Sequence, residues 1–403
     1  MQLSEKQNEY WNNATKRWNI KSGATRSGKT YLDYFLIPKR IRQAGSGLIV
    51  LVGNTKNTVE RNVLAPMRTK YGEKMVGTIS SNNNQVRLFG RTCHVLGAEK
   101  VNQVSKIQGA GISYCYGDEV TTWHADVFNM LKSRLSEEDS IFDGTCNPEG
   151  PKHWLKKFLD SDAEIFAQSY CIDDNPFLPP EFVENLKKEY WGSVYYDRFI
   201  LGEWIPAEGI IYRQFADNPH KFTTTDDSDV AYARIGVDFG GNKSAHTFYC
   251  VGFSADMKRV KILDEYYKKK EITPEELEDD FCDFVVRNKQ KYPLWEARCD
   301  SAETTLIKGL QAAVIKRGIA IDIKKAMKKR ITDRIRFVNV LISLGRFSVV
   351  EHCSKLIGAM CEAVWDEKKN EDVRLDNGEL NVDSLDAMEY AIEPDMDNIL
   401  MLR

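Results

Sequence analysis

Residues 23–30 have the composition and spacing of a loop that holds a polyphosphate chain. The segment Gly23-Ala24-Thr25-Arg26-Ser27-Gly28-Lys29-Thr30 satisfies the pattern G-x-x-x-x-G-K-[ST] in full. Its glycines let backbone N–H groups point at phosphate oxygens, and the helix that follows adds its positive N-terminal end. Lys29 is expected to reach the β- and γ-phosphates of ATP, and Thr30 to bind Mg²⁺. The alternative is a glycine-rich turn without a ligand.

An acidic pair follows an apolar strand further along the chain, where such a loop needs a partner. The strand-like run 112–116 leads into Gly117-Asp118-Glu119. Asp118 is expected to hold the metal ion directly or through water, and Glu119 to orient and deprotonate the attacking water. An acidic strand end that caps the next turn is the alternative.

Two further segments allow two interpretations each. The carboxamide of Gln7, in Leu3-Ser4-Glu5-Lys6-Gln7, can donate to and accept from an adenine edge; otherwise Ser4 caps a helix on which Gln7 faces solvent. Thr145 and Asn147, in Thr145-Cys146-Asn147-Pro148, lie at the end of a strand and either sense the γ-phosphate or belong to a plain Asn-Pro turn.

The C-terminal half offers carboxylates suited to binding metal ions. Asp238 and Asp300 each follow an apolar strand, and Asp383 and Asp386 share one face of a helix predicted over 382–392. Nucleases use such hard oxygen ligands to hold two Mg²⁺ or Mn²⁺ ions roughly 4 Å apart. Singly, each aspartate is more often a turn or helix cap. Together they have the strand-strand-helix layout of RNase H-like nucleases.

A basic run precedes the helix predicted from Thr332. Its residues Lys325, Lys328 and Lys329 are candidates for contacts with DNA phosphates that do not depend on sequence. Solvated helix surface is the commoner meaning of such a run. His246 is interpreted as structural.

Strands alternate with helices in both halves, which predicts an α/β fold. We expect a P-loop NTPase domain with a mostly parallel sheet at 1–205 and an RNase H-like domain at 230–403. The stretch 206–229 contains Pro, Gly, Thr and Asp with little periodicity, so it is predicted to be a linker. A hairpin is predicted around Gly90-Arg91, and a helical segment over 181–201.

Composition narrows the protein class. The net charge of −3 neither suggests nor excludes a nucleic-acid partner. Nine cysteines without a CxxC pair favour reduced, buried thiols over a structural zinc site. No apolar run approaches the length of a membrane span, and residues 1–20 lack the apolar core of a signal peptide, so a soluble intracellular protein is expected.

The ordered set of motifs resembles the large terminase subunit of tailed bacteriophages. After Gln7, the phosphate loop and Gly117-Asp118-Glu119, the resemblance continues through residues 145–154, and it covers nearly the whole chain. The later matching phrases are Asp174-Asn175-Pro176-Phe177 and Gly202-Glu203-Trp204.

This resemblance implies roles for particular residues. Arg26 would contact the nucleotide or its sensing network, Glu119 would be catalytic, and residues 145–147 would couple hydrolysis to movement. A trans-acting arginine from a neighbouring subunit would complete the site, with Arg134 as the candidate and an exposed helix arginine as the alternative. The implied metal ligands are Asp238, Asp300 and Asp386. The family often has His or Asn where this chain has Asp383, so that position binds a second metal ion or tunes one.

The function expected from the resemblance is a phage DNA-packaging motor in the host cytoplasm. It would move duplex DNA into the procapsid with ATP and cut concatemeric DNA as a metal-dependent endonuclease. The implied partners are double-stranded DNA, the terminase small subunit, the portal protein and further copies of the chain in a ring. The alternatives are a P-loop DNA helicase or remodelling ATPase with a non-catalytic DNA-binding C-terminal domain, and a non-enzymatic scaffold. The scaffold is disfavoured by the intact Lys29, Thr30, Asp118 and Glu119.

Overall fold

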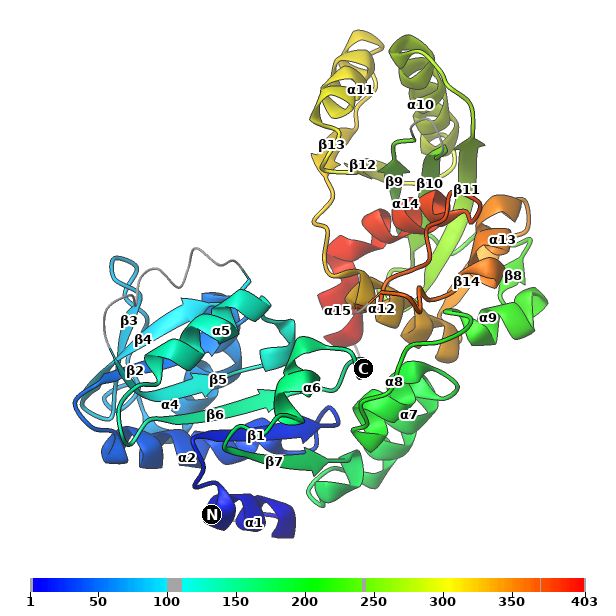
Figure 1. Cartoon of the computed structure of the whole chain (residues 1–403). Coiled ribbons are helices and arrows are strands. Elements are labelled where there is room, and N and C mark those ends of the chain that lie inside the picture. Colours follow the sequence, from blue (N-terminus) through cyan, green and yellow to red (C-terminus); the bar gives the residue numbers. More distant parts are fainter. Residues whose placement is uncertain (1–2, 100–110, 241–243, 370, 402–403) are drawn as a thin grey trace. The chain divides into compact units, whose positions relative to one another are not determined.

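The computed structural model describes residues 3–99, 111–240, 244–369 and 371–401, and divides into two compact units. Unit 1 comprises Met1–Lys187 and Val194–Pro206, and unit 2 comprises Lys188–Ser193 and Ala207–Arg403. Figure 1 labels their helices and strands.

Unit 1 is built on a sheet of seven strands within its described residues, in the order β3-β4-β2-β5-β6-β1-β7. Every neighbouring pair is parallel except β3 and β4, which form the predicted hairpin. The strands are β1 (Trp18–Gly23), β2 (Leu48–Gly53), β3 (Gln85–Leu88), β4 (Arg91–Gly97), β5 (Ile112–Gly117), β6 (Ile141–Cys146) and β7 (Ile165–Tyr170).

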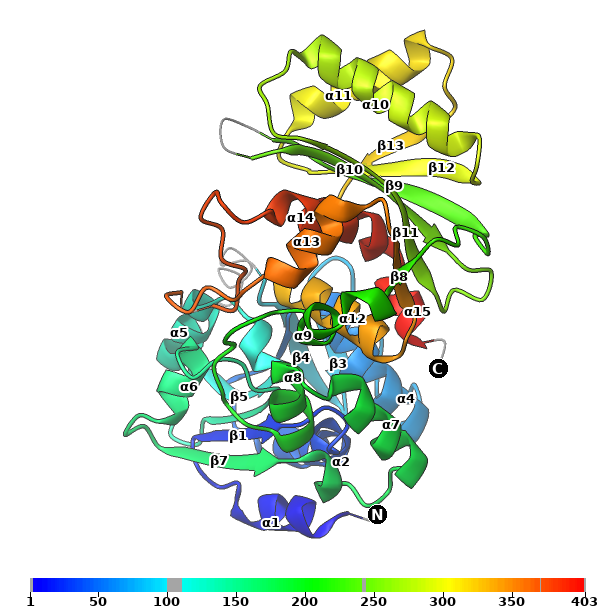
Figure 2. The same ribbon diagram turned by 90° about the vertical axis from the view of Figure 1, so that its right-hand side faces the viewer.

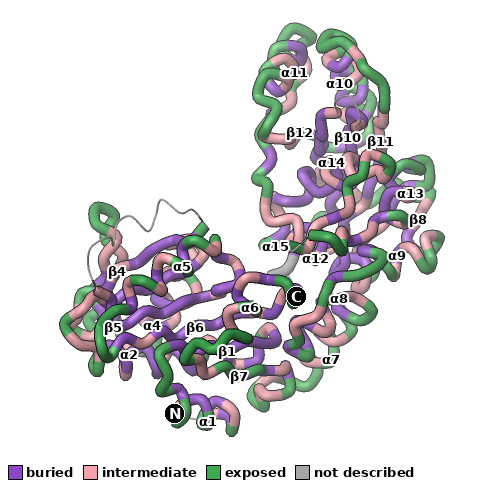
Figure 3. Tube along the Cα trace, viewed as in Figure 1, coloured by how far each residue is buried: buried purple, intermediate pink, exposed green. Residues whose placement is uncertain are grey.

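Apolar side chains cover both faces of this sheet, as expected for parallel strands. One face packs against α2, η1 and α4, and the other against α5 and α6. The strands are accordingly among the buried segments in Figure 3. The helices of unit 1 are α1 (Glu5–Asn13), α2 (Lys29–Gln43), α3 (Lys56–Val59), η1 (Glu60–Leu64), α4 (Ala65–Tyr71), η3 (Val120–Thr122), α5 (Ala125–Arg134), α6 (Trp154–Leu159), η4 (Ile172–Asp174), α8 (Val194–Tyr196) and η5 (Asp197–Leu201), with most of α7 (Pro180–Tyr190).

Unit 2 has a second sheet of seven strands among its described residues, in the order β13-β12-β9-β10-β11-β14-β8. An antiparallel meander of β9, β10 and β11 lies at its centre, and β12 pairs with β9 in parallel. This mixed sheet agrees with the RNase H-like class predicted for the second domain. The strands are β8 (Thr223–Thr224), β9 (Tyr232–Asp238), β10 (His246–Phe253), β11 (Val260–Lys268), β12 (Leu294–Cys299), β13 (Asp322–Lys325) and β14 (Phe347–Val350).

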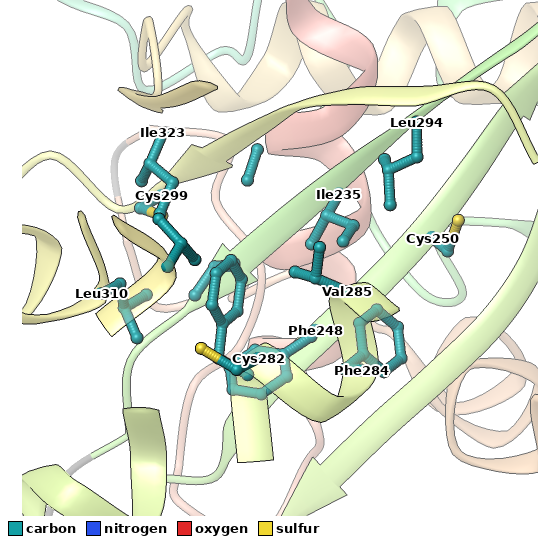
Figure 4. Close-up of a cluster of buried hydrophobic side chains, with 14 of the residues drawn as sticks. Ile235, Phe248, Cys250, Cys282, Phe284, Val285, Leu294, Cys299, Leu310 and Ile323 are labelled. Carbon is teal, nitrogen blue, oxygen red and sulfur yellow. The ribbon is translucent and has the colours of Figure 1, made fainter. Parts of the chain in front are cut away.

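Helices lie on both faces of this sheet, as Figure 2 shows: α10 and α11 on one face, α13 and α14 on the other. The first pair encloses a core with the inner sides of β9, β10 and β12, which Figure 4 shows in detail. The helices are α9 (Arg213–Asp217), η6 (Pro219–Lys221), α10 (Pro274–Lys289), α11 (Thr304–Lys316), α12 (Ile331–Ser343), α13 (Ser354–Glu362), α14 (Val382–Ile392), η7 (Glu393–Asp395) and α15 (Met396–Met401).

Two expectations about the chain between these cores differ from the structure. The predicted linker at 206–229 carries α9, η6 and β8, and residues from Ala207 onward belong to unit 2. Phe215 is fully buried and stacks on Phe222, so this segment buries aromatic surface despite its turn-rich composition. The helix predicted over 181–201 is interrupted at residues 191–193, where Gly192 adopts a positive φ of 74°.

All nine cysteines are free thiols in the structure. Seven are buried, and only Cys171 in unit 1 and Cys361 in unit 2 are partly exposed. None of the helices in the described ranges combines the length and apolar content needed to cross a membrane.

Candidate functional site

Three parallel strands of unit 1 end at one edge of the sheet, and each delivers a predicted site segment there. The phosphate loop follows β1, Asp118 follows β5, and Asn147 follows β6. Because β6 lies between β5 and β1, its end can contact both of the other segments.

The glycines of the phosphate loop are required by its geometry. Gly23 has φ +148°, and a Cβ there would lie 2.1 Å from the carbonyl oxygen of Tyr170 on β7. Gly28 has φ +89° and forms the N-cap of α2. The loop therefore reaches the helix N-terminus through backbone conformations that L side chains rarely adopt.

Lys29 lies inside this loop and is only 7% exposed. Its ammonium donates to the carbonyl oxygens of Gly23 at 2.8 Å and Ala24 at 2.5 Å, and to Asn147 Oδ1 at 3.2 Å. Burial lowers the pKa of Lys29 to about 8, although Glu119 opposes this shift. The ammonium is desolvated and held by neutral oxygens, so an anionic phosphate is a stronger partner for it.

The acids after β5 are connected to the same edge. Asp118 is 2% exposed; its carboxylate accepts from Asn62 Nδ2 at 2.9 Å and from Thr145 Oγ1 at 3.4 Å. Thr145 Oγ1 also accepts from the Glu119 N–H at 3.4 Å. Burial, and then the Glu119 carboxylate, raise the pKa of Asp118 to about 7. A bound cation is the natural counter-charge for this pair.

Glu119 has a left-handed backbone, with φ +51° and ψ +52°. A non-glycine residue pays roughly 1–2 kcal/mol for this conformation. Such outliers concentrate where the surrounding structure holds a functional side chain in place. Here the residue with this backbone conformation is Glu119, the predicted catalytic base.

Gln7 is buried at 2% exposure, so the interpretation that it faces solvent is wrong. Its Oε1 accepts from the N–H of Ser4 at 2.9 Å, and Ser4 caps α1 in return. Its Nε2 donates to the carbonyl oxygen of Gly28 at 2.8 Å, while Asn175 Nδ2 donates to that of Arg26 at 2.8 Å. Gln7 and Asn175 thus hold the loop by its backbone; contact of Gln7 with adenine stays a prediction.

The remaining predicted residues of unit 1 have less defined surroundings. Arg26 is exposed, with φ +61°, and Thr30 is half-buried at the start of α2. Ser27 is buried and donates to the carbonyl oxygen of Ala24 at 2.8 Å. Arg134 ends α5 and is half-buried, with its Nε atom buried and without a hydrogen-bond partner. Its expected role in a neighbouring subunit stays a prediction.

The four aspartates of unit 2 converge. Asp238 ends β9 and Asp300 follows β12; these strands pair in register with Val237 opposite Cys299, which places the two carboxylates on adjacent strands at one edge. Asp383 and Asp386 approach from α14, which packs against β9 so closely that a Cβ on Gly236 would lie 1.7 Å from the Ala387 carbonyl oxygen.

These carboxylates interact electrostatically. Asp238 is 9% exposed. Burial, and then the carboxylates of Asp386, Asp383 and Asp300, raise the pKa of Asp238 to about 9, while Lys328 opposes this shift. The four side chains, named here the acid cluster, therefore concentrate negative charge in a poorly solvated place.

Among the described residues, no three His, Cys, Asp or Glu side chains lie close enough together to hold a metal ion as placed. Three carboxylates of the acid cluster instead accept hydrogen bonds from other groups of the protein. Asp300 accepts from Lys328, Asp386 from Arg334 and Arg374 at 3.0 and 2.6 Å, and Asp383 from the Ala245 N–H at 2.6 Å. Carboxylate oxygens are suitable ligands for a hard divalent cation. For such a cation to bind, some of these contacts with protein groups must break.

A buried ionic network behind Asp386 was not predicted. Arg374 contacts Glu389 through two hydrogen bonds of 3.0 Å, and Tyr212 donates to Glu389 at 2.9 Å. Arg334 contacts Asp386 and Glu389, each at 3.0 Å. The sequence signal was the spacing of Asp386, Glu389 and Glu393, which recur every three or four residues and so share one face of a helix.

The other basic and imidazole candidates have partners inside unit 2. Lys325 donates to Thr304 Oγ1 at 3.0 Å, and Lys329 contacts Asp397 at 3.0 Å. His246 accepts the Gly240 N–H at 3.2 Å through Nδ1, which agrees with a structural role. Contacts of the lysines with DNA stay a prediction.

Comparison with known proteins gives one family and one group of close structural matches. Residues 20–217 match the family described as "Terminase large subunit, T4likevirus-type, N-terminal". No curated protein matches the sequence.

Among solved structures, the large terminase of a thermophilic bacteriophage is similar over 98% of this chain and 99% of that chain, with 24% identity and a TM-score of 0.84. Its complex with ADP matches with 24% identity and a TM-score of 0.81, over 99% of this chain and 100% of that one. Its complex with ATP-γ-S matches with 23% identity and a TM-score of 0.80, over 96% of this chain and 98% of that one. The likeness establishes a common fold across both units.

Proposed function

Because the chain belongs to the large terminase subunit family, we propose that it is a phage DNA-packaging motor in which unit 1 hydrolyses ATP and unit 2 cuts DNA. One observation carries this proposal: in each unit, the charged residues that the motifs single out lie together in one site. The nucleotide complexes of the similar large terminase from the thermophilic phage support ATP as the ligand of unit 1.

In unit 1, the phosphate loop binds the nucleotide through its backbone N–H groups and Lys29. Lys29 exchanges its neutral carbonyl partners for the β- and γ-phosphates, where its charge stabilises the transition state. Glu119 orients and deprotonates the attacking water, while Thr30 and Asp118 hold Mg²⁺. Asn147 contacts the Lys29 ammonium at 3.2 Å and Thr121 Oγ1 through its carbonyl oxygen at 3.2 Å. Movement of Lys29 toward phosphate is thereby transmitted to the end of β6, which is the coupling we assign to Thr145 and Asn147.

ATP binding is expected to weaken as pH rises above about 8. In the free protein burial lowers the pKa of Lys29 to about 8, whereas phosphate oxygens raise it in the complex. At pH values between the pKa of Lys29 in the free protein and its pKa in the complex, Lys29 takes up a proton when ATP binds. The Kd for ATP should therefore rise by up to about tenfold for each unit of pH increase in this range. Titration calorimetry of ATP-γ-S at pH 7, 8 and 9 in two buffers of different ionisation enthalpy measures both effects. Equal Kd at pH 7 and 9 would contradict this role of Lys29.

In unit 2, Asp238, Asp300 and Asp386 are the proposed metal ligands, with Asp383 as a second-metal or tuning residue. When bound, Mg²⁺ or Mn²⁺ supplies an activated water and stabilises the leaving oxygen of the phosphodiester. The acid cluster supplies negative charge for these cations, and burial of Asp238 excludes bulk water. Arg334 and Arg374 hold Asp386 on α14 in a fixed orientation.

The proposed partners follow from this activity. Duplex DNA would be both the cargo and the substrate, and Lys325 and Lys329 would contact its phosphates. A terminase small subunit, the portal protein of the procapsid and further copies of the chain in a ring would complete the motor. Arg134 is the proposed trans-acting arginine.

The deciding experiment is to assay the purified full chain for both activities. We expect ATP hydrolysis that increases on addition of duplex DNA, and conversion of supercoiled plasmid to nicked and linear forms with Mn²⁺. DNA-stimulated ATPase activity without any cleavage would support a helicase or remodelling ATPase instead. Absence of both activities would contradict the proposal.

A further inference from the structure

The loop after β13 carries a lysine into the acid cluster. Lys328 Nζ lies 2.5 Å from Asp300 Oδ1, and Lys328 has a left-handed backbone with φ +51°. The neighbouring Lys329 points elsewhere, to Asp397. Of these two neighbouring lysines, therefore, only Lys328 contacts the acid cluster.

A fully buried carboxylate holds this loop. Glu393, with 0% exposure, accepts the backbone N–H groups of three successive residues: Met327 at 3.0 Å, Lys328 at 3.1 Å and Lys329 at 3.1 Å. Successive N–H groups around a left-handed residue form a concave anion-binding site, and here the anion is a side chain of the protein itself. Glu393 follows α14, the helix that carries Asp383 and Asp386, so the loop and that helix are connected.

Lys328 differs from the other cations of the cluster in its freedom to move. Its side chain is 42% exposed, whereas those of Arg334 and Arg374 are 8% and 3% exposed and have several buried partners. A lysine ammonium is a compact charge on a flexible stem, so it can leave while its backbone stays in place.

On the basis of the nuclease function proposed above, we propose that Glu393 is a positioning residue that holds Lys328 as the resident cation of the acid cluster. The ammonium compensates the carboxylates when no divalent cation is bound, and metal binding displaces it from Asp300. Lys328 then becomes available to a DNA phosphate beside the metal ligands.

The test is Mn²⁺ binding by the full chain, measured by calorimetry and by electron paramagnetic resonance of free Mn²⁺. A nearby unit charge changes the proton affinity of a carboxylate by about one to three pKa units. Lys328→Gln is therefore expected to bind Mn²⁺ about tenfold or more tightly than the wild type. Lys328→Arg should retain wild-type affinity. The matched control Lys324→Gln, whose ammonium contacts Glu296 and Asp322 instead of the acid cluster, should be unchanged.

Glu393→Gln should tighten Mn²⁺ binding in the same direction, because Lys328 is no longer held in place. Since Glu393 acts through Lys328, it should have no further effect in the Lys328→Gln background. Additive effects in the double variant would overturn the positioning role and assign Glu393 a general structural one.

The outcomes separate this inference from the proposed function. Wild-type Mn²⁺ binding with unchanged affinity in Lys328→Gln would overturn only the resident-cation proposal. Absence of Mn²⁺ binding by both the wild type and Lys328→Gln would overturn the metal site itself. Weaker binding by Lys328→Gln would show that the lysine supports the metal site instead of competing for it, which also overturns the proposal.

Discussion

Replacement of Lys29 by alanine is expected to abolish ATP turnover while Mn²⁺-dependent plasmid cleavage continues. Lys29 is the buried cation of the phosphate loop, and its ammonium has Gly23, Ala24 and Asn147 as partners in the free protein. Loss of one preorganised donor to a transition-state oxygen costs about 10²–10³ in kcat, and a charged donor at phosphate costs at least as much. Steady-state phosphate release with and without DNA measures the loss.

Lys39→Ala is the matched control for this variant. Lys39 is ten residues further along the chain on the same helix, α2, and its ammonium lies 4.2 Å from the centre of the Trp11 ring, not in the loop. This control should retain ATPase activity, and the two variants should have similar circular dichroism spectra. Retained turnover in Lys29→Ala would refute the assignment of the phosphate loop.

Replacement of Asp238 by asparagine is expected to give the reverse result: no plasmid cleavage, with DNA-stimulated ATP hydrolysis intact. Asp238 is the most strongly perturbed member of the acid cluster, and an amide cannot supply a ligand charge. The cleavage rate should fall at least about 10³-fold, comparable to the loss of a required catalytic group. Gel assays over a range of Mn²⁺ concentrations measure it, with Asp322→Asn, an exposed position on β13, as the control.

The same variant is expected to be more stable than the wild type in the presence of a chelator. Burial and the other acids raise the pKa of Asp238 from 3.8 to about 9, so the folded chain holds one proton more than the unfolded chain between these pH values. Stability of the wild type therefore falls as pH rises through this window, and asparagine removes that slope. At pH 8 the gain should reach about 1 kcal/mol or more, a rise of about 2–4 °C in Tm, and it should vanish near pH 4.

Addition of Mn²⁺ should invert this order. The cation is expected to stabilise the wild type by binding the folded state alone, and to leave Asp238→Asn nearly unchanged. Thermal melting of the wild type and Asp238→Asn is measured with chelator and with Mn²⁺, each at pH 5 and pH 8, which gives four comparisons of the two proteins. A variant that melts below the wild type in chelator at pH 8 would show that the acid cluster is not electrostatically strained.

The sequence predicted the parts of each site that depend on local pattern. The phosphate loop, the acids after β5 and the strand-end Asp238 and Asp300 are recognisable because parallel strands end at one edge of a sheet, whatever their exact order. The residue pattern likewise located the helix predicted over 382–392, which matches α14. These features need no knowledge of long-range partners.

What could not be predicted depends on partners distant in sequence. Lys328 was assigned to the DNA surface because a basic run contains no information about Asp300, twenty-eight positions away. The stretch 206–229 was assigned as a linker because Phe215 packs against Phe347, which is far away in the sequence, and because β8 contains only two residues. Gln7 was expected at adenine or in solvent, since its partner Gly28 belongs to a different element.

The distribution of exposed thiols gives the chain two sites at which a thiol-selective dye can be attached, one in each unit. Burial raises the pKa of the enclosed cysteines, to about 12 for Cys93 and about 11 for Cys146, and deprives them of contact with reagents. The partly exposed Cys171 and Cys361 are left, one in each unit. Thiol-selective donor and acceptor dyes would consequently label each unit of the native sequence without engineered cysteines, and energy transfer between the dyes would test whether the distance between the units depends on bound nucleotide.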